Sequence, residues 1–346
     1  MKLEDFGYHL PEELIAQYPC DLRDASRMMV IWRKTGDVEC RIFRDLPEFT
    51  KKNDALVIND TKVIPARLIG NKTTGGAIEI LLLSRRPEES RRLETWEVLL
   101  RPAKRVRVGT RIFFDDECEA QVITCASEKK WVVSFATGFG FDNFLKKYGK
   151  TPLPPYIKRN KKSVDSLADI ERYQTIYARL PGSVAAPTAG LHFSQNILDT
   201  LKEIGVHIVP VTLHVGYGTF LPIEKENVED HVMEEEFFEI TPEAAEIINS
   251  ANTVTAVGTT STRVLESAAD ETGKIKPSSA LTRLFIYPGH RFRRVDSLIT
   301  NFHLPRSSLY LLACAFAGKH LIEKSYNQAI RNRFRFYSYG DCMLIL

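Results

Sequence analysis

Strand-like segments replace helical patterns between residues 66 and 136, and this change constrains the fold more than any single motif does. The segments lie near residues 66–71, 77–84, 96–100, 110–114, 119–125 and 130–136. Turn-forming sequences such as Thr74-Gly75-Gly76 and Asp115-Asp116 separate them. Several short strands at such close spacing are typical of a small β-sandwich or β-barrel. The middle of the chain must therefore form an all-β unit.

On both sides of this unit, strand and helix patterns alternate, which is typical of an α/β domain. Residues 206–213, 253–257 and 284–287 are predicted strands, whereas residues 242–249 and 306–317 show helical periodicity. A proline-rich linker, residues 151–155, follows the strand-rich part. We predict an α/β fold with an inserted small antiparallel β-barrel domain. Residues 1–61 and 152–346 form the α/β domain, and residues 62–151 form the barrel.

Composition excludes several classes of protein. The 346-residue chain has a formal net charge of +3, which permits an anionic partner without demanding one. Glu4 and Asp5 stand where a signal peptide would be basic, and the longest apolar run, residues 309–317, is too short to cross a bilayer. The six cysteines show no CxxC pair. We expect a cytoplasmic protein with reduced thiols, no membrane association and no metal.

Three histidines lie in loops that follow predicted strands, where α/β folds bind ligands. His192, His214 and His303 each stand close to Gly, Pro or Asn. The near-neutral pKa of histidine makes it the usual proton-transfer residue. A single loop histidine is more often structural or solvated, but three at matching strand ends favour at least one in a pocket. Metal binding is disfavoured, because only His231 has close acidic neighbours, Glu234 and Glu235.

Other polar loops have two interpretations each. The Gly258–Arg263 loop precedes a helix, so its N–H groups and Arg263 would suit a carboxylate or phosphate, or its threonines merely cap the helix. Asp60 and Asp341 would suit the donor edge of a guanine-like base, or they form Asx turns. Basic residues gather in clusters that suit RNA phosphates or a solvated surface. The clusters are Lys104, Arg105, Arg107 and Arg111; Lys158, Arg159, Lys161 and Lys162; Arg291, Arg293 and Arg294; and Arg331, Arg333 and Arg335 beside Phe334 and Phe336.

These segments, taken in order, resemble the S-adenosylmethionine:tRNA ribosyltransferase-isomerases of queuosine synthesis. The resemblance runs from residue 10 to 346 and rests on ten segments together. They are LPEELIAQYP with DASR, VINDTKVIPARL, PLPPYIKR, RYQTIYA, VAAPTAGLHF, VTLHVGYGTF, VGTTSTRVLES, FIYPGH, ITNFHLPRSSL and YSYGDCMLIL. Two positions depart from the family pattern. Glu234 stands where a histidine is usual, which puts a proton or metal role there in doubt, and Tyr217 stands where a small residue is common.

The resemblance implies an activity and its partners. The ribosyl part of S-adenosylmethionine would be transferred and isomerised onto 7-aminomethyl-7-deazaguanine at the wobble position of a tRNA with a GUN anticodon. The product would be epoxyqueuosine-tRNA, with adenine and methionine released. S-adenosylmethionine is then a substrate, and no prosthetic group is needed. We expect a monomer.

Loop position and resemblance together assign roles to residues. For proton transfer we select His192, His214 and His303. Residues assigned to S-adenosylmethionine are Thr188, Gly190, Gly216, Gly218, Thr219, Thr259, Thr260 and Arg263, with Arg263 on the methionine carboxylate. Residues assigned to the nucleotide and tRNA are Asn59, Asp60, Asn301, Tyr339, Asp341, Arg331 and Arg333. Tyr217, Phe302 and Tyr339 are candidate stacking platforms for an extruded base.

Two other classes of function stay open at this point. An S-adenosylmethionine-dependent RNA methyltransferase would normally show a Gly-rich loop after its first strand, which this sequence lacks. A non-catalytic RNA-binding protein would have little use for several polar loops containing Gly, Thr and His. Release of adenine and methionine, rather than S-adenosylhomocysteine, distinguishes the first class. S-adenosylmethionine binding distinguishes the second.

Overall fold

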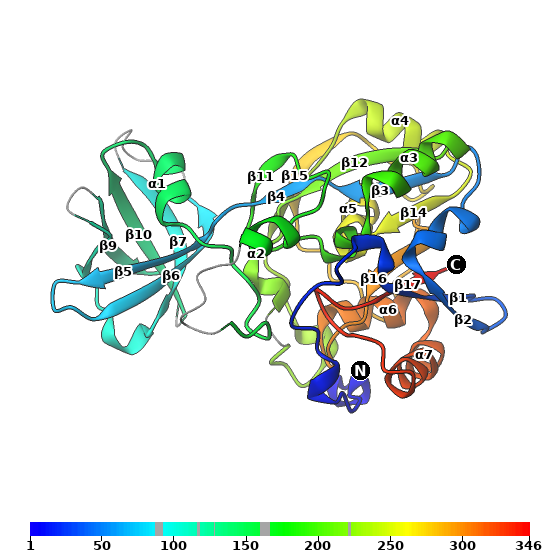
Figure 1. Cartoon of the computed structure of the whole chain (residues 1–346), viewed down its shortest axis with the longest axis horizontal. Coiled ribbons are helices and arrows are strands. Elements are labelled where there is room, and N and C mark those ends of the chain that lie inside the picture. Colours follow the sequence, from blue (N-terminus) through cyan, green and yellow to red (C-terminus); the bar gives the residue numbers. More distant parts are fainter. Residues whose placement is uncertain (87–92, 116–117, 128, 160–166, 221–222) are drawn as a thin grey trace.

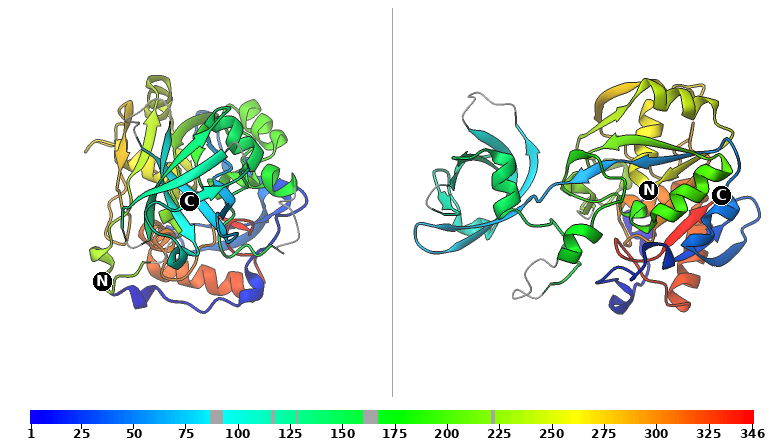
Figure 2. Two further views of the ribbon diagram at one scale, coloured as in Figure 1. Left: turned by 90° about the vertical axis from the view of Figure 1, so that its left-hand side faces the viewer. Right: turned by 45° about the horizontal axis from the view of Figure 1, so that its top comes forward.

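The computed structural model describes residues 1–86, 93–115, 118–127, 129–159, 167–220 and 223–346; the side chains of Leu167, Thr219 and Phe220 are not described. Two bodies stand side by side, a six-stranded barrel and a larger α/β domain (Figure 1). Two stretches of chain connect them (Figure 2). The predicted fold class is confirmed.

A nine-stranded mixed sheet forms the centre of the α/β domain, in the order β15-β13-β12-β3-β14-β16-β17-β1-β2. Strands β12, β3, β14 and β16 are parallel to one another, whereas β17 and β1 run in the opposite direction. The strands are β1 (Arg27–Ile31), β2 (Val38–Ile42), β3 (Ala55–Asn59), β12 (His207–Leu213), β13 (Glu236–Ile240), β14 (Val254–Val257), β15 (Ser278–Thr282), β16 (Ser297–Asn301) and β17 (Cys342–Ile345).

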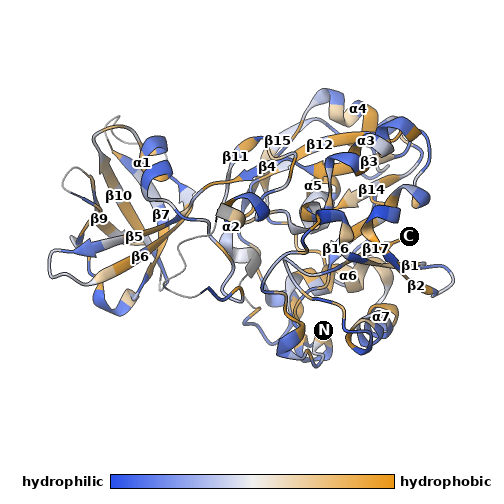
Figure 3. Cartoon of the chain, in the orientation of Figure 1, coloured by the Kyte–Doolittle hydropathy of each residue, from blue (hydrophilic) through white to orange (hydrophobic). Residues whose placement is uncertain are grey.

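Apolar side chains bury both faces of this sheet, as the colouring of the strands in Figure 3 shows. One face packs against α4 (Pro242–Ser250), α5 (Gly258–Ala268), α6 (Ser308–Ala317) and α7 (Lys319–Arg331). The other packs against α3 (Gln195–Ile204) and the 3₁₀ helices η4 (Phe43–Phe49) and η6 (Thr188–His192). Helix α3 begins where Ser194 Oγ accepts from Ile197 N and ends at Gly205 in a left-handed conformation, φ +90°.

The barrel closes in the order β10-β7-β6-β5-β8-β9, with all pairs antiparallel. Its strands are β5 (Arg67–Lys72), β6 (Ala77–Arg85), β7 (Glu94–Arg101), β8 (Arg111–Phe113), β9 (Cys118–Cys125) and β10 (Lys130–Thr137). Helix α1 (Phe141–Tyr148) packs Phe141 and Phe144 into the barrel core. Each strand falls on a segment predicted from its apolar pattern. The boundaries at residues 62 and 151 stay a prediction.

The two chain segments that connect the barrel to the α/β domain lie side by side and are antiparallel. Arg67 and Lys150 exchange both backbone hydrogen bonds, at 3.1 and 2.7 Å. A Cβ on Gly149 would lie 2.3 Å from the Pro65 carbonyl oxygen, so only glycine permits this approach. A second small sheet, β4 (Thr61–Val63) with β11 (Leu180–Ser183), lies at the same junction. Helix α2 (Leu167–Arg172) is the remaining α-helix of the described residues.

Two local predictions are wrong, and two strands were missed. Residues 284–287 form no strand, and the Leu284 carbonyl accepts a hydrogen bond from the Arg263 side chain instead of a neighbouring strand. The edge strand β15 and its neighbour β13 were not predicted. Gly258–Ser261 belongs to helix α5 rather than to a loop before it. In the described part of the chain, no helix combines the length and apolarity that a membrane crossing requires.

Candidate functional site

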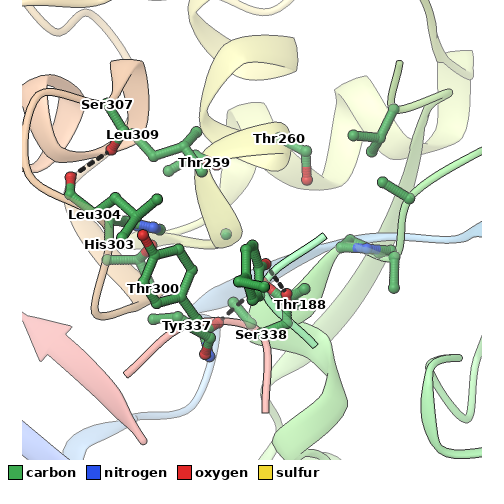
Figure 4. Close-up of a pocket in the computed structure, with 18 of the residues that line it drawn as sticks. Thr188, Thr259, Thr260, Thr300, His303, Leu304, Ser307, Leu309, Tyr337 and Ser338 are labelled. Atoms are coloured by element: carbon green, nitrogen blue, oxygen red, sulfur yellow. Dashed lines mark hydrogen bonds between the residues drawn. The ribbon is translucent and has the colours of Figure 1, made fainter. Parts of the chain in front are cut away.

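A cavity of about 240 Å³ lies in the α/β domain where strands β14 and β16 end. Residues 185–189, 258–260, 300–301, 303–307 and 337–338 supply most of its wall, together with Tyr156. Figure 4 shows Thr259 and Thr260 of α5 on one side, His303 to Leu309 on a second, and Thr188 and Ser338 on a third. Hydroxyl groups and one imidazole thus converge on a space of small-molecule scale.

His303 is the predicted histidine that lines this cavity. Its Nε2 lies 2.7 Å from Thr300 Oγ1, and its backbone N–H donates to Tyr326 Oη at 3.0 Å. Burial lowers the pKa of His303 to about 3. The imidazole is therefore neutral near pH 7, as a proton acceptor must be before it acts.

Asn301, also in the cavity wall, is held in a single amide orientation. Its Nδ2 donates to the Tyr337 carbonyl at 3.1 Å, and a carbonyl oxygen can only accept. The same Nδ2 lies 3.2 Å from His192 Nε2, so this ring nitrogen is the acceptor. Asn301 Oδ1 accepts from Thr188 Oγ1 at 3.2 Å. Asn301 therefore joins Thr188, in the cavity, to His192 behind it.

The contacts of His192 fix its tautomer. Because Nε2 accepts from Asn301, the ring proton resides on Nδ1 and is donated to Ser26 Oγ at 2.7 Å. Burial, with Arg335 and Arg23 nearby, lowers the pKa of His192 to about 3. The ring packs against Phe43 and does not line the cavity. His192 is connected to the cavity wall through Asn301.

His214 lies away from the cavity, at the junction with the barrel. Its Nδ1 is 2.8 Å from Thr61 Oγ1, and its ring stacks on Phe237. Gly182 admits the ring, since a Cβ there would lie 2.7 Å from His214 Cε1. Burial lowers the pKa of His214, although Asp60 and Glu239 oppose that shift.

Arg263 is buried on α5 and forms an ion pair with Glu236. Its Nε donates to the Leu284 carbonyl at 2.9 Å, and Glu236 also accepts from Gly216 N at 2.8 Å. The charge of Arg263 is thus already balanced. Its Nη2 and the hydroxyl of Thr260 are both buried and have no hydrogen-bond partner among the described residues.

These two atoms belong to residues that line a second, very small cavity of about 10 Å³. Thr259, Thr260 and Leu309 line both cavities, so the two adjoin. A buried donor without a partner costs about 1–3 kcal/mol, and such groups in native proteins commonly mark functional sites. Arg263 and Thr260 are therefore candidate ligand-binding donors at the edge of the main cavity.

The acidic residues predicted to read a base are engaged within the protein. Asp60 accepts from Arg179 and Thr212, at 2.8 and 2.7 Å. Asp341 accepts from the backbone and guanidinium of Arg27 and from Arg335 N. Neither aspartate lines the main cavity.

The other predicted nucleotide-binding and tRNA-binding residues also lie outside the cavity, apart from Asn301. Asn59 bonds to the backbone of Leu213 and Thr61. Tyr339 donates to Asp169 at 3.2 Å, and burial raises the pKa of Tyr339. Arg331 and Arg333 are exposed near the end of α7.

The predicted loop glycines make close contacts rather than lining the cavity. A Cβ on Gly190 would meet Tyr177, and one on Gly218 would meet Glu234. The side chain of Thr219, together with Lys161 and Lys162 from the sequence clusters, lies outside the described part. No group of three metal-ligating side chains occurs within the residues that the structure describes.

The sequence analysis missed several residues of the wall. Tyr156 and Tyr337 line the cavity with ring centroids 4.3 Å apart, and Tyr156 Oη lies 2.6 Å from Ser338 Oγ. Two wall residues, Arg306 and Tyr337, have φ of +60° and +72°. Such backbone strain clusters at functional sites. The available signal was their position inside motifs already singled out, ITNFHLPRSSL and YSYGDCMLIL.

A cavity that carries hydroxyl groups and an imidazole on a largely apolar wall, at a strand-direction switch of an α/β sheet, is typical of a ligand-binding α/β protein. A family model described as "Queuosine biosynthesis protein" matches residues 3–345. The chain belongs to this family.

Similar proteins extend the assignment. A protein of Syntrophus aciditrophicus is 60% identical, and one of Carboxydothermus hydrogenoformans is 49% identical; both alignments cover 100% of each chain. Both are named S-adenosylmethionine:tRNA ribosyltransferase-isomerase. A crystal structure titled S-adenosylmethionine tRNA ribosyltransferase, from Thermotoga maritima, aligns with TM-score 0.54 and 35% identity over 99% of this chain and 100% of that one.

The resemblance is thereby confirmed. The chain is an enzyme of queuosine biosynthesis and tRNA modification, a transferase of the S-adenosylmethionine:tRNA ribosyltransferase-isomerase class. The methyltransferase and non-catalytic alternatives are set aside.

The Asn301–His192 contact predicts different results for two substitutions. In His192→Gln the side-chain oxygen replaces Nε2 as acceptor, so we expect kcat within a few-fold of wild type and an unchanged pH profile. His192→Phe leaves an Asn301 N–H unpaired, and we expect kcat to fall about 10- to 100-fold, the equivalent of 1–3 kcal/mol. Steady-state kinetics with folded protein decide. Equal losses in both variants would show that His192 itself carries a proton.

The same histidine predicts how stability depends on pH. The folded-state pKa of His192 lies below its unfolded value, so its contribution is present above pH 6.5 and is lost as the pH falls towards 3. We expect His192→Gln to lose less unfolding free energy than wild type between pH 6.5 and 5. The difference in slope is at most about 1.4 kcal/mol per pH unit. Denaturant unfolding measures it, with the substitution of an exposed histidine, His320→Gln, as the control.

Proposed function

We propose that this enzyme transfers and isomerises the ribosyl moiety of S-adenosylmethionine onto 7-aminomethyl-7-deazaguanine at the wobble position of tRNA with a GUN anticodon. The product is epoxyqueuosine-tRNA, and adenine and methionine are released. One observation carries the proposal: the cavity joins hydroxyl groups, a neutral imidazole and two tyrosine rings at the edge of the sheet. The enzyme class already restricts the donor and the acceptor.

The sulfonium of S-adenosylmethionine dictates the first requirement of the site. Its positive charge acidifies the adjacent ribose C–H, and the base that removes this proton must be unprotonated when the substrate binds. We assign this step to His303, whose imidazole is neutral and lines the cavity. Aromatic faces attract cations, so Tyr156 and Tyr337 are suited to the sulfonium. Adenine must then leave with a proton, the neutral substrate amine attacks, and methionine leaves as an internal oxygen closes the epoxide.

Arg263 and Thr260 are suited to the methionine carboxylate. The buried Arg263 Nη2 and the Thr260 hydroxyl each have a hydrogen bond to give, and both residues line the small cavity beside the main one. Glu236 keeps the guanidinium fixed while Nη2 stays available. Roles for His214, Asp60, Asp341, Arg331 and Arg333 stay predictions, as do the monomeric state and the absence of a prosthetic group.

The identity of the products tests the reaction. Wild-type enzyme, S-adenosylmethionine and tRNA carrying the deazaguanine precursor should yield adenine, methionine and an epoxyqueuosine nucleoside in equal amounts, measured by mass spectrometry after nuclease digestion. The control reaction contains unmodified tRNA in place of the precursor tRNA, and no adenine should be released in it. Formation of S-adenosylhomocysteine instead would refute the proposal.

A lysine substitution tests the carboxylate site. Arg263→Lys retains a cation opposite Glu236, so the buried carboxylate is not left unpaired, but the fork that includes Nη2 is lost. We expect the KM for S-adenosylmethionine to rise about 10- to 100-fold, as for a lost charged hydrogen bond of 1.5–3 kcal/mol, with the KM for tRNA unchanged. The exposed pair Arg283–Glu235 supplies the control, Arg283→Lys. A wild-type KM in Arg263→Lys would remove Arg263 from the substrate site.

A further inference from the structure

One end of the barrel carries cations that lack acidic partners. Lys104 and Arg105 lie on the 3₁₀ helix η5 (Ala103–Arg105), Arg101 precedes it and Arg107 follows it. Lys72, at the end of β5, joins them because its Nζ donates to the Arg105 carbonyl at 3.2 Å. We name these five residues the η5 basic face. Among the described residues, none of the five has an acidic group within ion-pair distance.

The remainder of the barrel contrasts with this face. Arg67 forms an ion pair with Glu79, and Arg111 forms one with Glu119. Further cations are paired in the same way: Arg85 with Glu94, Arg86 with Glu97, and Lys147 with Asp115. These five described acids of the barrel are thus paired with other cations, and none of them compensates the positive charge of the η5 basic face. On a chain of net charge +3, this concentrates positive potential at one place.

The backbone of the η5 basic face is anchored by packing and by hydrogen bonds. Val106 is buried in the barrel core between exposed Arg105 and Arg107, which anchors the segment. The turn beyond it is closed by Arg107 N donating to Thr110 Oγ1 at 3.0 Å and by Gly109 N donating to the Val122 carbonyl at 2.8 Å. A backbone that is already ordered loses less conformational entropy on binding a polyanion than a flexible one does.

We propose that the η5 basic face binds the phosphate backbone of the tRNA substrate. This inference rests on the proposed function, since it takes tRNA as the partner. No described barrel residue lines the main cavity, which lies within the α/β domain. The barrel lies to one side of that domain (Figure 1). The face therefore contacts RNA away from the reacting nucleotide. It presents no aromatic side chain, so it suits phosphates rather than bases, and its contribution is independent of sequence.

Removing three charges tests the face. Kobs is the observed association constant for tRNA. In the variant Lys104→Gln/Arg105→Gln/Arg107→Gln, the negative slope of log Kobs against log salt concentration should become shallower by about 2–3, since each phosphate contact contributes about 0.7–0.9. Its KM for full-length tRNA should rise, with kcat and the KM for S-adenosylmethionine unchanged. The residues are exposed, and equal unfolding midpoints verify that the variant is folded.

The matched control removes three paired cations from the same barrel, Arg85→Gln/Arg86→Gln/Lys147→Gln, and so makes the same change in net charge. It should keep the wild-type salt slope. A wild-type slope in the η5 variant, or an equal fall in the control, overturns the inference. Failure of wild-type enzyme to release adenine from S-adenosylmethionine in the presence of precursor tRNA would refute the proposed function separately, because binding is measured without turnover.

Discussion

The antiparallel pairing of β16 with β17 determines which segments of the chain meet at the main cavity. Parallel strands β12, β3, β14 and β16 all end at one edge of the sheet, with Asn301 the last residue of β16. Asn301 pairs with Cys342, the first residue of β17. Because β17 runs in the opposite direction, the segment that leads into it returns to the edge where the other strands end. Tyr337 and Ser338 reach the cavity for this reason, although they lie far from Thr188 and Thr259 in the sequence.

Polar groups buried at that edge hold one another in place. Asn301 satisfies the Tyr337 carbonyl, His192 and Thr188 at once, so the amide cannot rotate without losing several hydrogen bonds. Glu236 similarly joins Arg263 on α5 to Gly216 beyond β12. A buried ion pair need not add stability, but it fixes geometry, which suits the proposed role of the cavity in orienting a sulfonium nucleoside. The binding wall is thus rigid because its supports are mutually saturated, with Arg263 Nη2 and the Thr260 hydroxyl left over.

The strands of the barrel and the central strands of the sheet could be predicted from the sequence. Their apolar periodicity directly reflects which of their side chains are buried. It placed His303, Thr188, Thr259, Thr260 and Asn301 in loops at strand ends, and these five residues line one cavity. It did not separate them from His192 or Asp60, since residue type and loop position are the same whether a side chain faces a cavity or a neighbour. Strand β13 and the edge strand β15 were not predicted. Only alternate residues of β13 are buried and β15 is largely exposed, so both have weak apolar patterns, and their place in the sheet is set by tertiary packing.

Glu234, where the resemblance leads one to expect a histidine, shows how such a departure acquires meaning only in three dimensions. Its carboxylate does not line the main cavity but forms an ion pair with Lys130 of the barrel, which also lies 3.2 Å from Glu97. Lys129 and Glu224 form a second pair across the same junction at 2.8 Å. These contacts, together with the Arg67–Lys150 backbone bridge, connect the barrel to the α/β domain from two directions. In this chain, Glu234 therefore helps to hold the two bodies together and takes no part in the wall of the main cavity.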